Sequence, residues 1–290
     1  MSTAPKIGFF GTPQLAVNAL DALEAHELTP SLIITNPDKA QGRKHIRTSS
    51  PVKIWAESRA IPLMQPSAFT DAESSALAAG AFDLFVVFAY GSLLPQQVID
   101  APRFGTINLH PSLLPRLRGA SPIRSAILED MRATGVSIIR MDEKMDHGPV
   151  LAQKEITIDR SAWPMKGREL DTLLVHEGSE LLASTIPQYL AGAIAPAPQD
   201  DADATFCSRI EKKDGELRID PFHLPSGDAA YQAYLKICAY DGWPGTFFMH
   251  KGGRVKIVDA SLREGALSII SVVPEGKREM PFAAFLNSLN

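Results

Sequence analysis

The sequence contains little cysteine and no long hydrophobic run. Its two cysteines among 290 residues, Cys207 and Cys238, form no Cys-x-x-Cys pair. That excludes a disulfide framework and a zinc site built from thiolates, and it fits a reducing compartment. The longest uninterrupted apolar stretch, residues 84–90, is much shorter than the ~20 residues of a membrane-spanning helix. No secretory signal pattern follows Met1. We therefore expect a cytoplasmic protein with no membrane partner.

The sequence also lacks an excess of positive charge. Its formal net charge is −4, which argues against broad, non-specific binding of nucleic acid but leaves room for a local basic surface. A composition of 45% hydrophobic and 21% charged residues is that of an ordinary globular protein. The length suits two domains.

Strand and helix patterns alternate from the start of the chain. An apolar run at 6–10 predicts a strand, Thr12 and Pro13 predict the N-cap and first residue of a helix, and 31–35 predicts the next strand. Such alternation is typical of an α/β fold with a doubly wound, mostly parallel, Rossmann-like sheet. The glycines of the first turn do not complete a dinucleotide fingerprint, so a nicotinamide site is not predicted.

Three polar residues follow apolar strand patterns further along the chain. Asn108 and His110 lie at the end of a predicted strand, 104–109, and Asp146 follows another, 135–141. Residues two apart on an extended segment project from the same face, so Asn108 and His110 should point into one space. An amide, an imidazole and a carboxylate at strand exits form a plausible constellation for acyl transfer.

Each of these side chains has a chemical role in such a reaction. Asn108 offers an N–H donor to a developing oxyanion, and removing one such donor typically costs ~10²–10³ in rate. His110 can carry a proton near neutral pH, and Asp146 can orient the imidazole. Taken singly, all three are more often structural. Asp142 and His147 could suggest a metal site with His110, but no helical His pair or Cys ligand supports it, so no metal is predicted.

Ser112, close to His110, raises the alternative of a covalent serine mechanism. No Gly-x-Ser-x-Gly elbow surrounds it, and the residues that follow, Leu-Leu-Pro, predict a loop. Direct transfer without a covalent intermediate is therefore the favoured mechanism.

A basic loop is predicted between 36 and 50, before a helix that Ser50 caps and Pro51 begins. Between 39 and 53 there are no acidic residues and five basic ones, Lys39, Arg43, Lys44, Arg47 and Lys53. A charge run is usually a solvated surface. A long loop in a compact α/β domain is nevertheless often functional, and Lys and Arg side chains suit phosphate backbones.

The run from Asn108 to Pro115, Asn-x-His-x-Ser-Leu-Leu-Pro, with Asp146 before a glycine, resembles the signature of enzymes that use 10-formyltetrahydrofolate as formyl donor. Asn-Pro-Asp-x-x-x-Gly-Arg from Asn36, ending in Ser-Pro-Val-Lys, is similar to the loop by which the methionyl-tRNA formyltransferases engage initiator tRNA. The family resemblance covers nearly the whole chain and is weaker in the C-terminal part.

The resemblance implies a set of site residues. Asn108, His110 and Asp146 would be catalytic, and initiator methionyl-tRNA would contact Arg43, Lys44 and Arg47, with Arg43 leading. Arg116 and Arg118 would be further candidates for substrate contact. The folate co-substrate, 10-formyltetrahydrofolate, would be bound by Ser112, Leu113, Leu114, Pro115, Ala89, Tyr90, Gly91 and Leu94.

One departure from the tRNA enzymes is Pro111, where they most often have glycine. Proline there is typical of formyltransferases of the purine pathway and of sugars. An amino sugar or another small amine therefore stays open as the acceptor. From a different class, a non-catalytic RNA-binding module stays open too, although the intact trio argues against it. Hydrolysis of the formyl-folate is a further possibility.

The pattern predicts three parts of the chain. Residues 1–190 would form the formyltransferase catalytic domain. Residues 191–204, rich in Pro and Asp, would form a linker. The remainder, 205–290, combines short strand patterns with turn signals and a helix near 229–239. By resemblance it would be an OB-like, tRNA-binding domain, and the protein would be a monomer.

Overall fold

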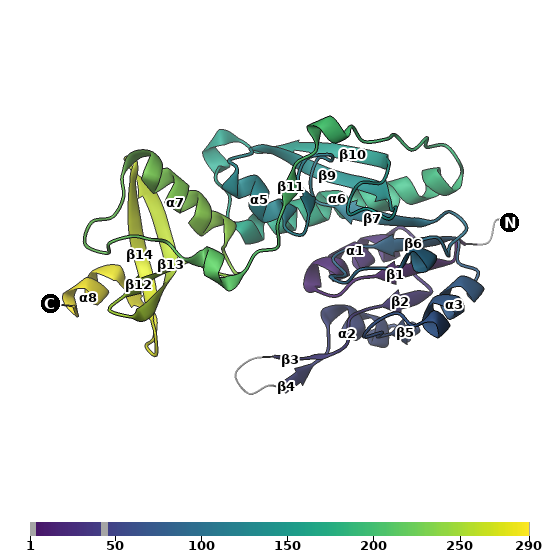
Figure 1. The fold of residues 1–290 in the computed structure, drawn as a ribbon, viewed down its shortest axis with the longest axis horizontal. Helices are drawn as coiled ribbons and strands as arrows, with labels where there is room; N and C mark the ends of the chain where they lie inside the picture. Colours follow the sequence, from purple (N-terminus) through teal and green to yellow (C-terminus); the bar gives the residue numbers. More distant parts are fainter. Residues whose placement is uncertain (1–3, 42–45, 290) are drawn as a thin grey trace. The chain divides into compact units, whose positions relative to one another are not determined.

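The largest sheet of the protein has seven strands, in the order β10-β9-β7-β6-β1-β2-β5 (Figure 1). The structure, a computed structural model, describes residues 4–41 and 46–289. The strands of this sheet are β1 (Ile7–Phe10), β2 (Leu32–Ile34), β5 (Leu63–Met64), β6 (Leu84–Val87), β7 (Thr106–His110), β9 (Ala133–Arg140) and β10 (Val150–Thr157). Five of them, from β7 to β5, are parallel, and β9 runs antiparallel to β7.

Helices cover both faces of this sheet because its central strands β1, β2 and β6 have no polar side chains on either face. From β1, Ile7 and Phe9 pack with residues of three helices, and Phe10 packs on the other side with residues of two more. The first set is α1 (Gln14–Ala25), α2 (Pro51–Ser58) and α6 (Gly167–Leu190), and the second is α3 (Asp71–Ala79) and α4 (Gln96–Ile99). The predicted doubly wound, mostly parallel sheet is confirmed.

The two predicted helix starts have different outcomes. Ser50 is the N-cap of α2, and its hydroxyl accepts a hydrogen bond from the Lys53 N–H at 3.1 Å, as predicted. Thr12 does not cap α1, whose N-cap is Pro13 and whose first residue is Gln14. The hydroxyl of Thr12 instead donates to the carbonyl of Tyr90 at 3.0 Å, so it links two loops rather than a loop and a helix.

The basic loop contains a small antiparallel ribbon that the sequence did not predict. Its strands are β3 (Lys39–Gln41) and β4 (Ile46–Thr48), with Lys39 opposite Thr48 and Ala40 opposite Arg47. Within this hairpin Arg47 is described, and Arg43 and Lys44 lie outside the described residues.

The C-terminal part forms a four-stranded antiparallel sheet, so the predicted β-rich, OB-like fold class is confirmed. Aromatic and aliphatic side chains of the sheet and its helices form a separate core that includes Phe248, Val272 and Phe285. The elements are β12 (Phe247–His250), β13 (Gly253–Arg263), β14 (Ala266–Pro274), β15 (Met280–Pro281), α7 (Gly227–Ala239) and α8 (Phe282–Asn287) (Figure 1). Two short strands, β8 (Arg118–Gly119) and β11 (Phe206–Cys207), pair with each other outside these two sheets, and α5 (Pro122–Leu128) lies between β8 and β9 in the sequence.

The chain divides into two compact units, each built from three segments. The N-terminal unit is Met1–Arg118, Gly135–Ile156 and Thr172–Thr205, and the C-terminal unit is Gly119–Thr134, Thr157–Asp171 and Phe206–Asn290. Among the residues that the structure describes, no helix is both long and apolar enough to span a membrane.

Candidate active site

The carboxyl ends of four parallel strands, β1, β2, β6 and β7, meet at one edge of the N-terminal sheet. The register places Phe10 beside Val87 and Val87 beside Asn108, so the segments that follow these strands are neighbours. In open α/β sheets, ligands bind in the crevice beyond this edge. The predicted catalytic and folate-contacting residues belong to segments at or near it.

The three predicted catalytic side chains converge on one oxygen atom. Asp146 Oδ1 accepts a hydrogen bond from Asn108 Nδ2 at 3.3 Å and lies 3.6 Å from His110 Nδ1. The side chains of His110 and Asp146 are only 5% and 15% exposed, so a positive charge that develops on the imidazole during a reaction would be poorly screened from the carboxylate.

The prediction that all three residues occupy strand exits is wrong in detail. Asn108 lies in the middle of β7, with its side chain on the same face as His110. Because β9 runs antiparallel to β7 and ends at Arg140 beside Ile107, the following loop has to turn back before it presents Asp146. The strand pattern did not predict this antiparallel pairing. The pairing explains how Asp146, six residues after the end of β9, comes to lie beside Asn108 and His110.

The other nitrogen of His110 is held by the backbone. His110 Nε2 lies 2.9 Å from the carbonyl oxygen of Leu117, and a carbonyl can only accept a hydrogen bond. This contact assigns the proton of the neutral ring to Nε2 and leaves the lone pair on Nδ1, the atom that faces Asp146. A proton taken up at Nδ1 would therefore be stabilised by the carboxylate.

Asp146 adopts an unusual backbone conformation. Its φ of 51° lies in the left-handed region, which few residues other than glycine occupy, although Asp tolerates it better than most. Its carbonyl oxygen accepts a hydrogen bond from Gln199 Nε2 at 2.9 Å, and the carbonyl of Gly148 accepts another from the same atom at 2.7 Å. A Cβ at Gly148 would collide with the carbonyl of Arg140, so the loop also requires glycine there.

The serine beside His110 is buried and its hydroxyl is engaged. Ser112 is 1% exposed, and its Oγ donates to the carbonyl of Arg116 at 2.6 Å. Ser137 Oγ donates to the Ser112 carbonyl at 2.6 Å and accepts from the Leu114 N–H at 3.1 Å. The hydroxyl of Ser112 thus closes a loop, a role that favours direct transfer over a covalent serine intermediate.

The segment 89–94, predicted to contact folate, is anchored by a residue that the sequence reasoning missed. Asn36, which follows β2, donates from Nδ2 to the carbonyl of Tyr90 and accepts from Ser92 Oγ at 2.8 Å. Burial, with a smaller contribution from the carboxylate of Glu73, raises the pKa of Tyr90 to about 12. Ala89 and Gly91 both have positive φ, 50° and 81°. The segment is therefore a fixed turn and not a loose loop.

A hollow opens beside this turn, within the N-terminal unit. Two segments line it, the loop after β5 and the turn after β6: Pro66, Ser67, Ala68, Phe69, Tyr90, Ser92, Leu93, Leu94 and Pro95. Tyr90 and Leu94 were predicted to contact folate, whereas the loop 66–69 was not. Its position after a strand at the same sheet edge is the signal that would have found it.

Two of the basic residues considered for substrate contact, Arg118 and Lys53, bind other side chains of the protein. Arg118 has a side chain only 4% exposed, and its guanidinium binds Gln199 Oε1 and Asp201, which argues against a contact with substrate. Lys53 forms an ion pair with Asp38 at 2.8 Å. The hydrogen bond from Lys53, together with one from Gln65, holds the pKa of Asp38 below its usual value. Lys53 is therefore a structural residue, whereas Arg47 is exposed.

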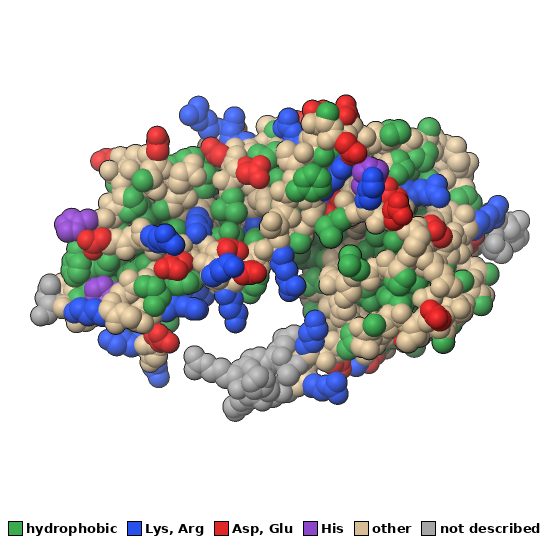
Figure 2. Space-filling model, in the orientation of Figure 1, with side chains coloured by type: hydrophobic (Ala, Val, Ile, Leu, Met, Phe, Trp, Pro, Cys, Tyr) green, Lys and Arg blue, Asp and Glu red, His purple; other side chains and the backbone are tan. Residues whose placement is uncertain are grey.

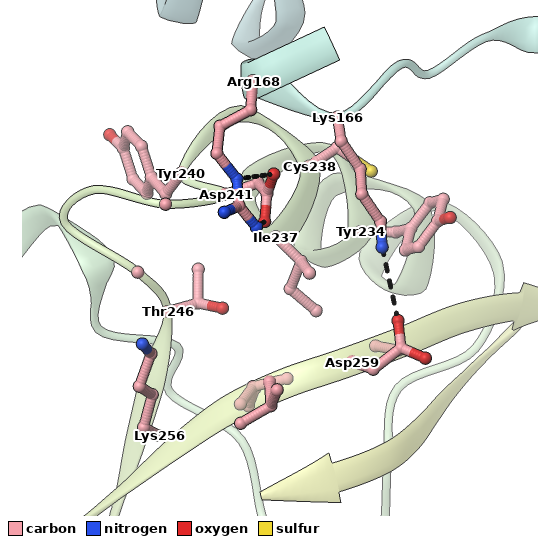
Figure 3. A pocket seen from close by; sticks show the side chains of 15 residues that line it. Lys166, Arg168, Tyr234, Ile237, Cys238, Tyr240, Asp241, Thr246, Lys256 and Asp259 are labelled. Atoms are coloured by element: carbon pink, nitrogen blue, oxygen red, sulfur yellow. Dashed lines mark hydrogen bonds and ion pairs between the residues drawn. The ribbon is translucent and has the colours of Figure 1, made fainter. Parts of the chain in front are cut away.

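The C-terminal unit has a hollow of its own, which contains none of the predicted site residues (Figure 3). Two of the cations that line it are paired: Arg168 contacts Asp241 at 2.9 Å and Lys166 lies 3.5 Å from Asp259. On the surface of this unit, Lys and Arg side chains gather over the C-terminal strands, at the left of Figure 2, and those of β13 include Arg254 and Lys256. This surface supplies local positive charge on a chain that is negative as a whole.

No metal centre is evident in residues 4–41 and 46–289, where no three His, Cys, Asp or Glu side chains are grouped to hold an ion. Asp142 and His147, considered with His110 in the sequence, do contact each other, with His147 Nδ1 at 2.6 Å from Asp142 Oδ2. His110 instead faces Asp146 and Leu117.

Known proteins resemble this chain over most of its length. A family model described as formyl transferase matches residues 5–166. The methionyl-tRNA formyltransferase of Thermus thermophilus is 36% identical, with the alignment covering 96% of this chain and 94% of that protein. Among solved structures, methionyl-tRNA formyltransferase from Clostridium thermocellum has a TM-score of 0.60 at 18% identity and covers 93% of this chain and 98% of its own.

A second solved structure is an N-formyltransferase from Helicobacter canadensis in complex with folinic acid and dTDP-3-aminofucose. It has a TM-score of 0.64 at 17% identity and covers 89% of this chain and 88% of its own. At such identities these two structures establish a shared fold, while the relative at 36% identity establishes the family.

Proposed function

The chain belongs to the methionyl-tRNA formyltransferase family, and from this premise we propose that Asn108, His110 and Asp146 transfer a formyl group directly to an amine. The donor is 10-formyltetrahydrofolate, and the acceptor is the α-amino group of methionyl initiator tRNA. The observation that carries the proposal is the convergence of Asn108 and His110 on Asp146 Oδ1, within the segment that matches the formyl transferase model.

The reaction passes through a tetrahedral intermediate. The amine attacks the formyl carbon, and His110 Nδ1, which carries the lone pair, takes the proton that the amine loses. The amide of Asn108 has two N–H groups, so one can hold Asp146 while the other donates to the oxyanion. When the C–N bond to the folate breaks, the imidazolium returns its proton to the leaving nitrogen. Asp146 stabilises the imidazolium between these steps.

The folate is assigned to the edge of the sheet beside the trio. We infer contacts from Ser112, Leu113, Leu114, Pro115, Ala89, Tyr90, Gly91 and Leu94. The hollow lined by Tyr90 and Leu94 supports this assignment, and it adds the loop 66–69 as a further wall. The buried hydroxyl of Ser112 already binds within its own loop, so Ser112 would contribute through its backbone and the shape of that loop.

The tRNA is assigned to the hairpin β3–β4 and to the basic surface of the C-terminal unit. Arg43, Lys44 and Arg47 would bind phosphate groups of the acceptor stem, and Arg47, which lies within the described residues, is exposed. Residues 205–290 would add affinity through their own Lys and Arg side chains. The enzyme would act as a cytoplasmic monomer without a metal ion.

One feature of the sequence supports a second acceptor, an amino sugar. Pro111 is typical of formyltransferases of sugars, and the Helicobacter canadensis structure contains an amino-sugar nucleotide. The basic hairpin and the full-length similarity to the tRNA enzymes favour tRNA. An intact catalytic trio likewise favours an enzyme over a non-catalytic RNA-binding module.

A direct assay separates these acceptors. The purified protein is mixed with 10-formyltetrahydrofolate and either Met-charged initiator tRNA or a panel of amino sugars, and formyl-methionine is measured after mild deacylation. We expect product with the charged tRNA. Transfer only to a sugar amine would keep the trio and discard the tRNA assignment, and binding of RNA without any transfer would leave the non-catalytic module.

A further inference from the structure

The segment 197–205, which apart from its last residue belongs to the predicted linker, lies against the catalytic loops of its own unit. We call it the strap. It begins with a pair of backbone hydrogen bonds between Ala197 and Val150, at 2.7 and 2.8 Å, which join it to the start of β10. It ends at Thr205, whose N–H donates to the carbonyl of Pro115 at 3.3 Å. The strap is therefore tied to both loops that carry or orient the trio.

Gln199 is the strap residue at the Asp146 loop. Its Nε2 donates to the carbonyls of Asp146 and Gly148, at 2.9 and 2.7 Å, and so bridges the two residues on either side of His147. Its Oε1 accepts from Arg118 Nε and Nη2, at 3.0 and 2.9 Å. A side-chain amide is needed here, because one end must donate twice and the other must accept from a buried guanidinium.

Thr205 is the strap residue at the other loop. Its Oγ1 accepts from the Leu117 N–H at 2.9 Å, and its carbonyl accepts from the Arg118 N–H at 2.9 Å. Leu117 has a φ of 59°, a conformation that a branched side chain rarely adopts and that needs support from its surroundings. The carbonyl of Leu117 is the group that fixes the tautomer of His110.

We propose that the strap is a positioning element of the catalytic site, in which Gln199 holds Asp146 and Thr205 holds Leu117 and, through it, His110. Gln199 and Thr205 each bind the backbone of a residue in the left-handed region, Asp146 and Leu117 respectively. Neither touches the reacting atoms, so their effect should appear in turnover and not in substrate affinity. The inference rests on the proposed function for its readout in activity.

The test begins with Gln199→Leu, which removes both donors and the acceptor. A displacement of about 1 Å at a catalytic group can cost on the order of 10² in rate, so we expect kcat to fall by ~10- to 100-fold. The KM values for formyl-folate and charged tRNA should stay within about twofold, because ground-state contacts are kept. Gln188→Leu is the matched control, since Gln188 is exposed on α6 and its side chain donates to the carbonyl of Ser184 within the same helix.

A second variant identifies which end of Gln199 matters. Gln199→Glu keeps an acceptor for Arg118 but has no donor for Asp146 and Gly148, so it should lose as much turnover as Gln199→Leu. A Gln199→Glu variant with wild-type kcat would overturn the role assigned to the donors. At the other loop, Thr205→Val should lower kcat by about tenfold or less, and Thr205→Ser, which keeps the hydroxyl, should restore it.

A double-mutant cycle separates positioning from a general loss of structure. In an Asp146→Asn background, measured by single turnover with enzyme in excess, Gln199→Leu should add little, because its effect passes through Asp146. An equal loss in both backgrounds would contradict the proposal. If the wild-type protein does not formylate tRNA, the proposed function fails, and amide hydrogen exchange over residues 142–149 still tests the strap. Faster exchange in Gln199→Leu supports it, and unchanged exchange overturns it.

Discussion

Two parts of the N-terminal unit are built in opposite ways. Around the trio, polar groups are held by partners far away in the sequence, as when Gln199 binds the carbonyl of Asp146 and Thr205 binds the N–H of Leu117. The hairpin β3–β4 is held together by pairing between its own two strands, with Lys39 opposite Thr48. The first arrangement fixes positions, and the second presents side chains to solvent.

The difference reflects what each part has to do. Stabilising an oxyanion and moving a proton depend on groups that are in place before the reaction, in surroundings with little water. Binding a phosphate backbone depends mainly on the number of positive charges and tolerates variation in their geometry. Single substitutions should therefore have large effects on turnover in the first part and graded effects on affinity in the second.

The largest effect is expected at His110. We expect His110→Ala to lower kcat by ~10²–10⁴, because the proton that the amine loses then has no positioned acceptor. The folded structure should persist, since thermal unfolding depends on the whole core. Single-turnover formylation of Met-charged tRNA measures the loss, and circular dichroism checks the fold. Near-normal turnover in this variant would remove the mechanism assigned to the trio.

Asn108→Ala tests the oxyanion donor and should have the next largest effect. Loss of one such donor typically lowers kcat by ~10²–10³ with little change in KM. Because Asn108 also binds Asp146, part of the loss could come through the carboxylate. Asn108→Asp keeps the size of the side chain but replaces the donor by a second negative charge beside Asp146. It should therefore be at least as inactive, and recovery of activity in Asn108→Asp would contradict the donor role.

The sequence alone indicated the features of this site that follow a local pattern, and it missed those that depend on contacts distant in sequence. Strand periodicity predicted that Asn108 and His110 share one face of a strand, and the structure places both side chains beside Asp146. The contributions of Gln199 and Asn36 were not found, because each contacts a residue more than fifty positions away and belongs to a segment with the composition of a loop or linker. The alternating elements predicted the sheet, whereas the antiparallel direction of β9 depends on pairing that local patterns do not encode.

Charge runs were the least informative signal in the sequence. Lys53 and Arg47 belong to the same basic run, yet Lys53 is paired with Asp38 and Arg47 is exposed. Arg118 belongs to the motif beside the trio, yet its guanidinium is buried against Gln199 and Asp201. Which cations are available to a substrate is decided by tertiary contacts, so a count of basic residues cannot separate structural from binding roles.

Arg47→Ala measures the graded effect expected of the hairpin. Loss of one phosphate contact should raise KM for charged tRNA by a few fold, leave kcat nearly unchanged and lower the salt dependence of binding by about one unit of slope. Lys53→Met is the matched comparison from the same basic run. It should leave the salt dependence unchanged and lower the melting temperature, because it removes the partner of Asp38.

The effect of Lys53→Met on the melting temperature should also depend on pH. The pKa of Asp38 is lowered in the folded protein, chiefly by the hydrogen bond from Lys53, so the pair stabilises the folded state above the ordinary pKa of Asp. The difference in melting temperature between the wild-type protein and Lys53→Met should therefore shrink as the pH falls below about 4. A difference that persists at lower pH would show that Lys53 stabilises the fold by packing and not by its charge.

The smallest effect on turnover is expected at Ser112, although it lies in the motif between His110 and the predicted folate contacts. Its hydroxyl binds the carbonyl of Arg116 and is 1% exposed, so Ser112→Ala should keep kcat within about threefold and lower the free energy of unfolding by ~1 kcal/mol. Steady-state kinetics and denaturant unfolding measure the two quantities. A loss of turnover comparable to that of His110→Ala, with an unchanged fold, would favour a covalent serine intermediate. Retained turnover would instead show that closeness to His110 in the sequence gives this hydroxyl no part in the chemistry.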